Sequence, residues 1–372
     1  APGMAWRRLP VFAWAAAICS WLMLVIGPVM LAAITMLMID RNFNGVFFAD
    51  GSGGAPLLWQ HLSWIFFTGA YMLILITAFG AIAEIVPAFA RKPLFNRGAT
   101  IGSLAAIAVL GTLAWMQNML TAPIGIGWMY FAMIMSLALI VPFGLVVFNL
   151  IATMVGGALR MRAPLLFAVG AISAISIGLG AEIEQSMVGA AWQLKNTTDA
   201  TAATHFALIG GSVFGGFAAL HYWFPKMTGR TMGESLARIS FWTMAVGILV
   251  AFVPLFLAGA EQGEVADAYK FFSHTGVDAY NLIASIGAFV LAIGIVTTLV
   301  NAILSRTGGA EAGHDPWGGD SLEWLTLSPP EPHNFDVLPD VRSPRPMRDI
   351  REAIAHRSAR AEQPAPQRQP VA

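Results

Sequence analysis

Long apolar runs, separated by short polar stretches, dominate the pattern of this chain. A helix that crosses a bilayer needs about 20 mostly apolar residues. Runs of roughly this length span residues 11–38, 58–87, 99–120, 128–157, 164–189, 201–224, 237–260 and 277–305. The alternating period of a transmembrane β-barrel is absent, and a helix satisfies its own backbone hydrogen bonds in lipid. The pattern therefore predicts an all-α fold, a polytopic membrane helix bundle of about eight transmembrane helices over residues 1–306.

The composition agrees with a membrane protein and excludes nucleic acid as a partner. Hydrophobic residues make up 57% of the chain and charged residues 11%, against about 25% charged in a soluble domain. The formal net charge is +0, whereas a nucleic-acid-binding face is basic. Cys19 is the single cysteine, so no intrachain disulfide can form. The opening Ala-Pro-Gly-Met has no cleavable signal pattern, and we expect a processed chain or the C-terminal part of a longer product.

Basic residues gather in alternate connecting segments. One set of segments carries Arg7, Arg8, Arg91, Lys92, Arg97, Arg160, Arg162, Lys226, Arg230, Arg238 and Arg306. The other set carries only Arg41, Lys195 and Lys270, mixed with Asp40, Asp50, Asp199, Glu261, Glu264 and Asp267. The positive-inside rule then predicts a protein of the cell's inner (plasma) membrane with both termini in the cytoplasm. Residues 307–372 are rich in Pro and Arg without a helical period, which predicts a cytoplasmic tail. Its first part (315–335) is expected to be semi-ordered and its end (357–372) disordered.

Four stretches carry a resemblance to a known family. They read "AITMLMIDRNFNGVFF" (33–48), "VFNLIATMVGGALRMRAPLLFAVG" (147–170), "THFALIGGSVFGGFAALHYWFPKMTGR" (204–230) and "DPWGGDSLEWLTLSPPEPHNFDVLPDVRS" (315–343). Together they resemble subunit I of the heme-copper terminal oxidases, the catalytic subunit of cytochrome c oxidase. The collinear match covers helices five to twelve of that family. It implies the aerobic respiratory chain, with an N-terminal helical part outside this chain, other oxidase subunits and cytochrome c as partners. Such a match does not establish the activity.

The resemblance places the family's copper site on residues that bind copper poorly. Within "QHLSWIFFTGAYMLILI" (60–76), the copper-binding histidine falls on Thr68. The glutamate of the proton path falls on Ala70, and the cross-linked tyrosine falls on Met72. Copper of this kind takes imidazole nitrogens. The resemblance therefore implies that these three functions are lost.

The family's two adjacent copper-binding histidines fall on Gln117 and Asn118, within "WMQNML" (115–120). Amides form hydrogen bonds well, so we expect Thr68, Gln117 and Asn118 to hydrogen-bond to each other across two helices, without copper. The alternative is a Cu(I) site made of thioethers, although methionine is also a common filler of apolar gaps. Its candidate ligands are Met72, Met116 and Met119.

Of the family's two heme-ligand positions in "AATHFAL" (202–208), one is replaced and one keeps a histidine. The ligand of the oxygen-binding heme falls on Ala203, which cannot bind iron. The ligand of the low-spin heme falls on His205, which can. His205 is therefore the candidate axial ligand of one low-spin heme, whose other ligand lies in the family on a helix that precedes this chain. The alternative is a membrane histidine bonded to a neighbouring helix, although polar groups at this depth tend to be functional.

Further family positions are also replaced. The lysine of the proton path falls on Val146 and a nearby polar residue falls on Phe143. The outer magnesium-binding pair falls on Lys195 and Asn196. The arginines that hold the heme propionates fall within "AGAEQGEVAD" (258–267), which contains no arginine. These losses together point away from oxygen chemistry.

The other polar groups of the helices have ordinary interpretations. Glu182 and Glu184 lie near the outer end of a helix, which favours a solvated or interfacial position over a proton relay. Glu84 lies near an inner end and is predicted to snorkel or to pair with Arg91 and Lys92.

Two histidines near helix ends also have ordinary interpretations. His61 is predicted to be structural. His221 precedes Tyr222 and Trp223, which predicts a place in the aromatic belt of the membrane interface.

Three functions stay open at this point, and whether the chain is an enzyme stays open with them. The first is a degenerate oxidase subunit I relative that cannot reduce oxygen by itself and binds at most the low-spin heme. The second is a component of a working, proton-pumping cytochrome c oxidase, which passes electrons from cytochrome c to oxygen. The third is a hemeless scaffold or assembly partner. Cofactor content separates them, because only the second needs two hemes and copper.

Overall fold

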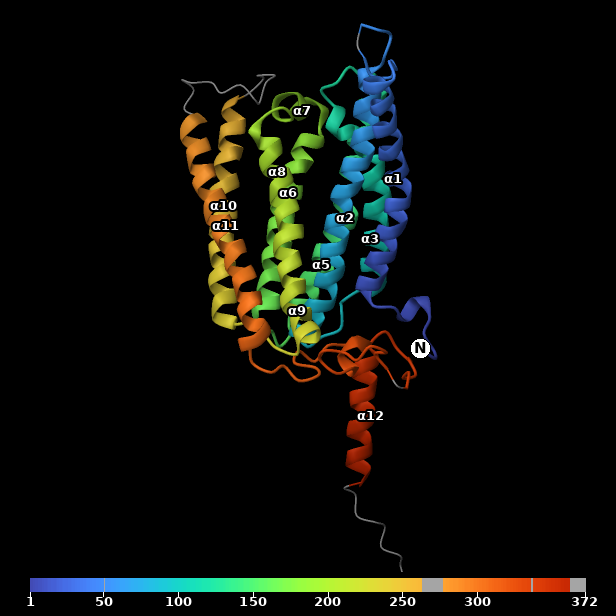
Figure 1. Cartoon of the computed structure of the whole chain (residues 1–372), viewed down its shortest axis with the longest axis vertical. Helices are drawn as coiled ribbons and strands as arrows, with labels where there is room; N and C mark the ends of the chain where they lie inside the picture. The colour runs from blue at the N-terminus through green and yellow to red at the C-terminus, as the bar shows by residue number, and fades with distance from the viewer. Residues whose placement is uncertain (50, 263–276, 336, 362–372) are drawn as a thin grey trace, which may run out of the picture.

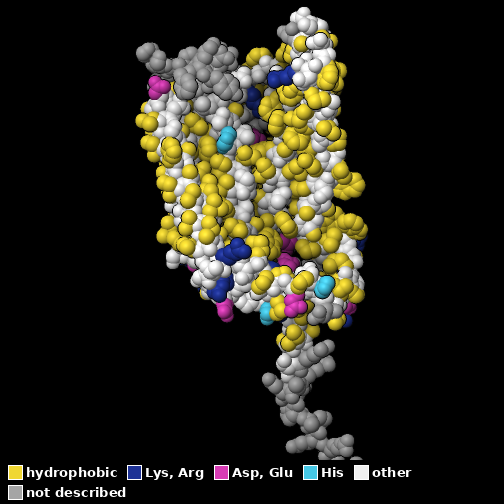
Figure 2. Space-filling model, viewed as in Figure 1, with side chains coloured by type: hydrophobic (Ala, Val, Ile, Leu, Met, Phe, Trp, Pro, Cys, Tyr) yellow, Lys and Arg dark blue, Asp and Glu magenta, His cyan; other side chains and the backbone are white. Residues whose placement is uncertain are grey.

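A bundle of long helices forms the body of the protein (Figure 1). The structure, a computed structural model, describes residues 1–49, 51–262, 277–335 and 337–361. Within these residues, 8 helical spans are long and apolar enough to cross a membrane. Apolar side chains cover the sides of the bundle, while charged side chains gather mostly at its ends (Figure 2). The predicted all-α membrane bundle is therefore confirmed, and its end that carries the N terminus is called the inner end below.

The crossings follow the predicted apolar runs closely. They are α1 (Val11–Asn42), α2 (Pro56–Ala90), α3 (Arg97–Leu113) continued by the 3-10 turn Trp115–Met119, α4 (Ile126–Ala138) with α5 (Ile140–Met154), α6 (Ala163–Ser186), α8 (Thr198–Ile209) with α9 (Gly216–Thr228), α10 (Glu234–Gln262) and α11 (Val277–Gly308). A short helix, α7 (Val188–Leu194), connects α6 to α8 at the outer end.

Small residues let the central helices approach closely. A Cβ on Gly69 of α2 would lie 2.8 Å from Ile26 of α1. The π-helical turn Gly210–Gly215 joins α8 to α9, and a Cβ on Gly210 would lie 2.8 Å from the Cβ of Ala174 on α6. Packing of this kind is how helices associate in lipid, where apolar burial supplies little drive. These contacts hold α1 against α2, and the junction of α8 and α9 against α6.

The inner end of α1 is capped by a glutamate from α2. Pro10 precedes α1 and has no side chain that can cap it. Instead, Glu84 accepts hydrogen bonds from the backbone N–H groups of Val11 (2.6 Å) and Phe12 (3.3 Å). Free N–H groups at a helix start attract a carboxylate. The predicted pairing with Arg91 or Lys92 is therefore wrong.

His221 lies inside the bundle, and its predicted place in the aromatic belt is wrong. Its side chain is 3% exposed and stacks on Phe167 of α6 with ring centroids 4.9 Å apart. Its Nδ1 donates to the carbonyl of Phe217 at 2.7 Å. The next residue, Tyr222, is 0% exposed, because the segment after α11 covers this end of α9.

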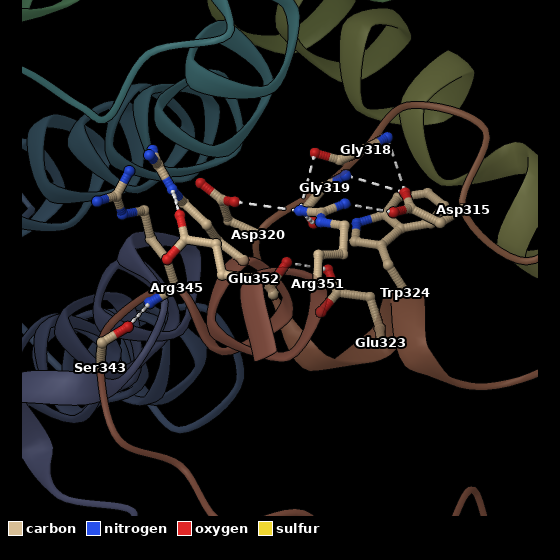
Figure 3. Close-up of polar contacts among 12 residues, drawn as sticks. Asp315, Gly318, Gly319, Asp320, Glu323, Trp324, Ser343, Arg345, Arg351 and Glu352 are labelled. Atoms are coloured by element: carbon tan, nitrogen blue, oxygen red, sulfur yellow. Dashed lines mark hydrogen bonds and ion pairs between the residues drawn. The ribbon is translucent and has the colours of Figure 1, made fainter. Parts of the chain in front are cut away.

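The segment after α11 folds under the inner end and ends in α12 (Pro346–Ala361). Figure 3 shows how Arg351 ties α12 to this segment. Arg351 donates to Asp315 Oδ2 (2.7 Å) and to the carbonyl of Gly319 (2.8 Å), while Asp315 Oδ1 accepts from the N–H of Gly318 (2.8 Å). A tail without helical period was predicted here, and for α12 that prediction is wrong.

The sequence does carry local signals for α12. Pro346 stands at the start of the helix and Asp349 in its first turn, both of which favour a helix N-terminus. Arg348 and Glu352 form an ion pair at 2.7 Å with the i,i+4 spacing of a helix. The end predicted to be disordered covers residues 357–372. For residues 357–361 that prediction is wrong, because they belong to α12, and residues 362–372 lie outside the described residues.

Candidate functional site

A cavity of about 830 Å³ lies between α2, α6 and α8 in the outer half of the bundle. Most of the positions that the family resemblance singles out line it. They are Thr68, Ala70, Met72, Gln117, Asn118, Lys195, Asn196 and His205. Residues far apart in the sequence thus converge on one space, as a shared site requires. Ala203, Val146 and Phe143 do not line this cavity.

The replaced copper ligands hydrogen-bond as predicted for one pair only. Asn118 Nδ2 donates to Thr68 Oγ1 at 3.1 Å across two helices. Gln117 makes other contacts, donating to Ser186 Oγ (2.9 Å) and accepting from Ser136 Oγ (3.2 Å). The prediction for Gln117 is therefore wrong, because the structure turns its amide towards α6 and α4. The amide and hydroxyl groups at these positions are thus engaged in hydrogen bonds within the protein, and groups of this kind are weaker copper ligands than imidazole.

The usual metal-binding side chains are scattered in the described part of the chain. Among those residues, no group of three or more His, Cys, Asp or Glu side chains could hold a metal ion. Met72 packs in the main core beside Gly111, whereas Met116 belongs to a separate apolar cluster with Met129. Met72 and Met116 therefore lie in different apolar clusters, which does not favour a shared thioether site.

His205 has the environment of an available ligand. Its Nδ1 lies 2.8 Å from the carbonyl oxygen of Thr201, within its own helix. Because a carbonyl oxygen only accepts, Nδ1 carries the proton and Nε2 keeps its lone pair in the neutral ring. The ring lies against Phe252 of α10, with centroids 5.5 Å apart, and lines the cavity. A backbone bond that fixes the tautomer is typical of histidines that bind metals, so this residue fits a heme iron.

Ala203, at the position of the other heme ligand, does not fit an iron site. It is 0% exposed and lies where α8 meets α6. A Cβ on Gly178 of α6 would lie 2.5 Å from both the carbonyl oxygen of Ala203 and the N–H nitrogen of Ala207. The two helices are thus in backbone contact here. The alanine side chain at position 203 has no atom that can bind iron.

Glu182 faces the cavity, and its predicted interfacial position is wrong. It accepts hydrogen bonds from the hydroxyls of Tyr71 (3.1 Å) and Thr204 (3.5 Å), and it lines the cavity with both. Glu184 is exposed, as predicted. Sequence reasoning missed Tyr71, which follows the family's glutamate position directly. A polar hydroxyl in an apolar helix was the available signal.

The cavity continues towards both ends of the bundle. A neighbouring cavity of about 700 Å³ shares Trp64, Phe67, Asn118 and Asn196 with it and extends along the outer start of α2. His61 lies in this region, where its Nδ1 accepts a hydrogen bond from Trp115 Nε1 at 3.3 Å. This contact agrees with a structural role for His61.

On the inner side, a third cavity of about 210 Å³ reaches Phe143. Val146 nearby is 0% exposed, so apolar side chains occupy both positions of the family's proton path. The stretch 258–267 is described only as far as Gln262, and its described part holds no arginine. Gln262 accepts from the N–H of Thr198 at 2.9 Å, which ties α10 to the start of α8.

Comparison with known proteins relates the chain to respiratory oxidases. A family described as "Cytochrome C and Quinol oxidase polypeptide I" matches residues 1–290. Cytochrome c oxidase subunit 1 of Bacillus subtilis is 34% identical over 366 residues, which cover 98% of this chain and 58% of that protein. Its counterpart in Thermostichus vulcanus is 37% identical over 340 residues, with 91% and 61% covered. The chain therefore spans about six tenths of the length of these relatives.

The fold has a solved counterpart. A chain of a heme-copper terminal oxidase dimer, determined by cryo-EM, superimposes with a TM-score of 0.69 at 14% sequence identity. The similarity covers 95% of this chain and 72% of that chain. At this level of identity the comparison shows the shared helical fold alone.

Proposed function

Since the chain belongs to the cytochrome c and quinol oxidase polypeptide I family, we propose that it is a membrane subunit of a bacterial respiratory oxidase complex that binds one low-spin heme and does not reduce oxygen by itself. The observation that carries the proposal is the environment of His205. Its Nε2 keeps a lone pair at the wall of a cavity large enough for a cofactor. Its Nδ1 bond to Thr201 holds the ring in the orientation that a ligand needs.

The other ligand positions support the absence of oxygen chemistry. Reduction of oxygen in this family uses an iron that faces a copper ion. Thr68 and Asn118 are bonded to each other, and Gln117 is bonded to Ser186 and Ser136. Ala203 offers no ligand atom and is packed against α6. The donors that remain favour a single heme over a heme-copper pair.

A bound heme would supply one-electron transfer at this site. His205 would hold its iron, and the stacked ring of Phe252 limits the rotation of the imidazole. A further iron ligand would come from the family's second helix, which is not in this chain; the relatives are longer than the part that this chain covers. Other oxidase subunits, the lipid bilayer and, through the complex, cytochrome c are the proposed partners.

The test is the cofactor content of the complete gene product, purified in detergent. We expect about one heme per chain, measured by extraction into pyridine, and no copper by elemental analysis. Two hemes with copper and oxygen consumption would overturn the proposal in favour of a working cytochrome c oxidase. Complete absence of heme would overturn it in favour of a scaffold or assembly partner.

A further inference from the structure

Lys195 differs from the other lysines that the structure describes. Lys92 donates to the carbonyls of Val155 and Ala152, and Lys226 likewise donates to backbone carbonyls. Lys195 directly follows α7 at the outer rim, is half-buried and lines the cavity. Its Nζ has no hydrogen bond or ion pair with any residue of the described part of the chain. It is a cation turned to the cavity without a bonded partner.

The charge of Lys195 is incompletely balanced. Burial lowers the pKa of Lys195 to about 8, while the carboxylate of Glu182 opposes that shift. Glu182 is already engaged by Tyr71 and Thr204. An ammonium that loses solvation without a full counter-charge is stabilised by any anion that reaches it. The cavity therefore has a place for an anionic group at its outer rim.

The spacing of Lys195 and His205 suits one elongated ligand. Lys195 stands just before α8, which begins at Thr198. His205 follows Thr198 by seven residues on the same helix, so its backbone lies about 10 Å further along the helix axis than the start of α8. The carboxylates of a heme lie on one edge of the porphyrin, well away from the iron. A cation at the rim can therefore bind a carboxylate of the same heme whose iron is bound by the imidazole below.

We propose that Lys195 is the positioning residue that binds a propionate carboxylate of the heme held by His205. The inference rests on the proposed function, because it concerns the same heme. It supplies a cation where the described part of residues 258–267 has no arginine. Lys195 thus sets the orientation of the heme, with its carboxylates towards the outer end.

The experiment compares two ligands in the complete gene product from which heme has been removed. One ligand is hemin, with free carboxylates, and the other is hemin dimethyl ester, in which both carboxylates are blocked. Wild-type protein should bind hemin about tenfold more tightly than the ester, as expected for one charge-assisted hydrogen bond. Lys195→Met should bind hemin about as weakly as the ester, and Lys195→Arg should restore the preference. Arg41→Met is the matched control, because Arg41 is an exposed outer-end cation on α1.

The pH dependence gives a second readout that a purely structural role would not move. The ammonium is present below the pKa of about 8, so the preference for free carboxylates should be full near pH 7 and decline as pH rises towards about 10. Among the described residues, the titratable groups that line the cavity with Lys195 are Glu182 on α6, Tyr71 on α2 and His205 on α8. Because Lys195→Met keeps all of these, its preference should not change with pH in this range.

The outcomes separate the two proposals. If the wild type binds neither ligand through His205, the proposed function is wrong and the assignment of Lys195 is wrong with it. If the wild type binds hemin and Lys195→Met keeps the full preference over the ester, only the assignment of Lys195 is overturned. Loss of the preference in Lys195→Met, with retention in Arg41→Met, supports the assignment.

Discussion

The inner end of the bundle and the outer cavity use the same kinds of side chain in different ways. At the inner end, Lys226 is 7% exposed and its Nζ donates to the carbonyls of Thr326 (2.8 Å), Leu327 (3.2 Å) and His314 (3.3 Å). In the outer cavity, Lys195 makes no such bond with any described residue. The first lysine is part of the structure, whereas the second is available to a ligand.

Two half-buried glutamates, Glu84 and Glu182, differ in a related way. Glu84 at the inner end caps the backbone of α1, and its partners are fixed parts of the chain. Glu182 in the cavity is bonded to side-chain hydroxyls of Tyr71 and Thr204, at the wall of an open space. We infer that a charged side chain in a membrane bundle indicates function where the protein does not satisfy all of its hydrogen bonds. Changes at the inner end should therefore lower stability, and changes in the cavity should alter binding.

The largest loss of stability is expected for Lys226→Met. This change keeps most of the side-chain volume but leaves buried carbonyls of the inner segment without a donor, at a cost of about 3 kcal/mol. It also removes a cation that lies 5.4 Å from the ring centre of Trp324. Thermal unfolding in detergent measures the effect. Arg306→Met, an exposed change at the end of α11, is the control. Equal melting temperatures of the two variants would contradict the structural role assigned to Lys226.

A smaller loss is expected for Glu84→Ala. The change leaves the N–H groups of Val11 and Phe12 without the carboxylate that now accepts from them, and loss of a helix cap costs about 1–2 kcal/mol. Glu84→Gln keeps an oxygen acceptor and should lose less. The apparent melting temperature of the two variants gives the comparison. Equal loss in both would show that charge, and not capping, is the contribution of Glu84.

The smallest effect is expected for Thr68→Val in the cavity. It removes the oxygen that accepts from Asn118 Nδ2, which costs about 1 kcal/mol. Heme content should stay at the wild-type level, because Thr68 is not assigned to the heme. Thr77→Val is the matched control on the same helix, since its hydroxyl bonds only within α2 and to Cys19. A loss of heme in Thr68→Val alone would mean that this hydroxyl contributes to the heme site.

The sequence was sufficient for the membrane fold because its signal is local. An apolar run of spanning length predicts a helix wherever it occurs, and the observed spans agree with the predicted runs. The helix α12 was missed because its sequence is charged and has no long apolar run. Pro346 and the Arg348–Glu352 ion pair are the local signals that indicate it. Short helices of this kind are identified by caps and ion pairs, not by hydropathy.

The site could be predicted in its positions but not in its contacts. The family resemblance brought Thr68, Asn118 and His205 to one place, and the cavity joins them. The partners of Gln117 and Glu182 depend on how α6 is rotated against α2 and α8, which no single helix encodes. Small residues such as Gly178 decide that rotation through close contact, and their consequences become visible only in three dimensions.

The most direct test of the account is the reduced-minus-oxidised optical spectrum of the complete gene product and of His205→Ala. We predict the spectrum of a low-spin heme in the wild type and its loss in His205→Ala. His61→Ala, which changes a histidine bonded to Trp115 at the outer end, should keep the spectrum. An unchanged heme spectrum in His205→Ala, or no heme spectrum in the wild type, would contradict the assignment of the outer cavity as a heme site.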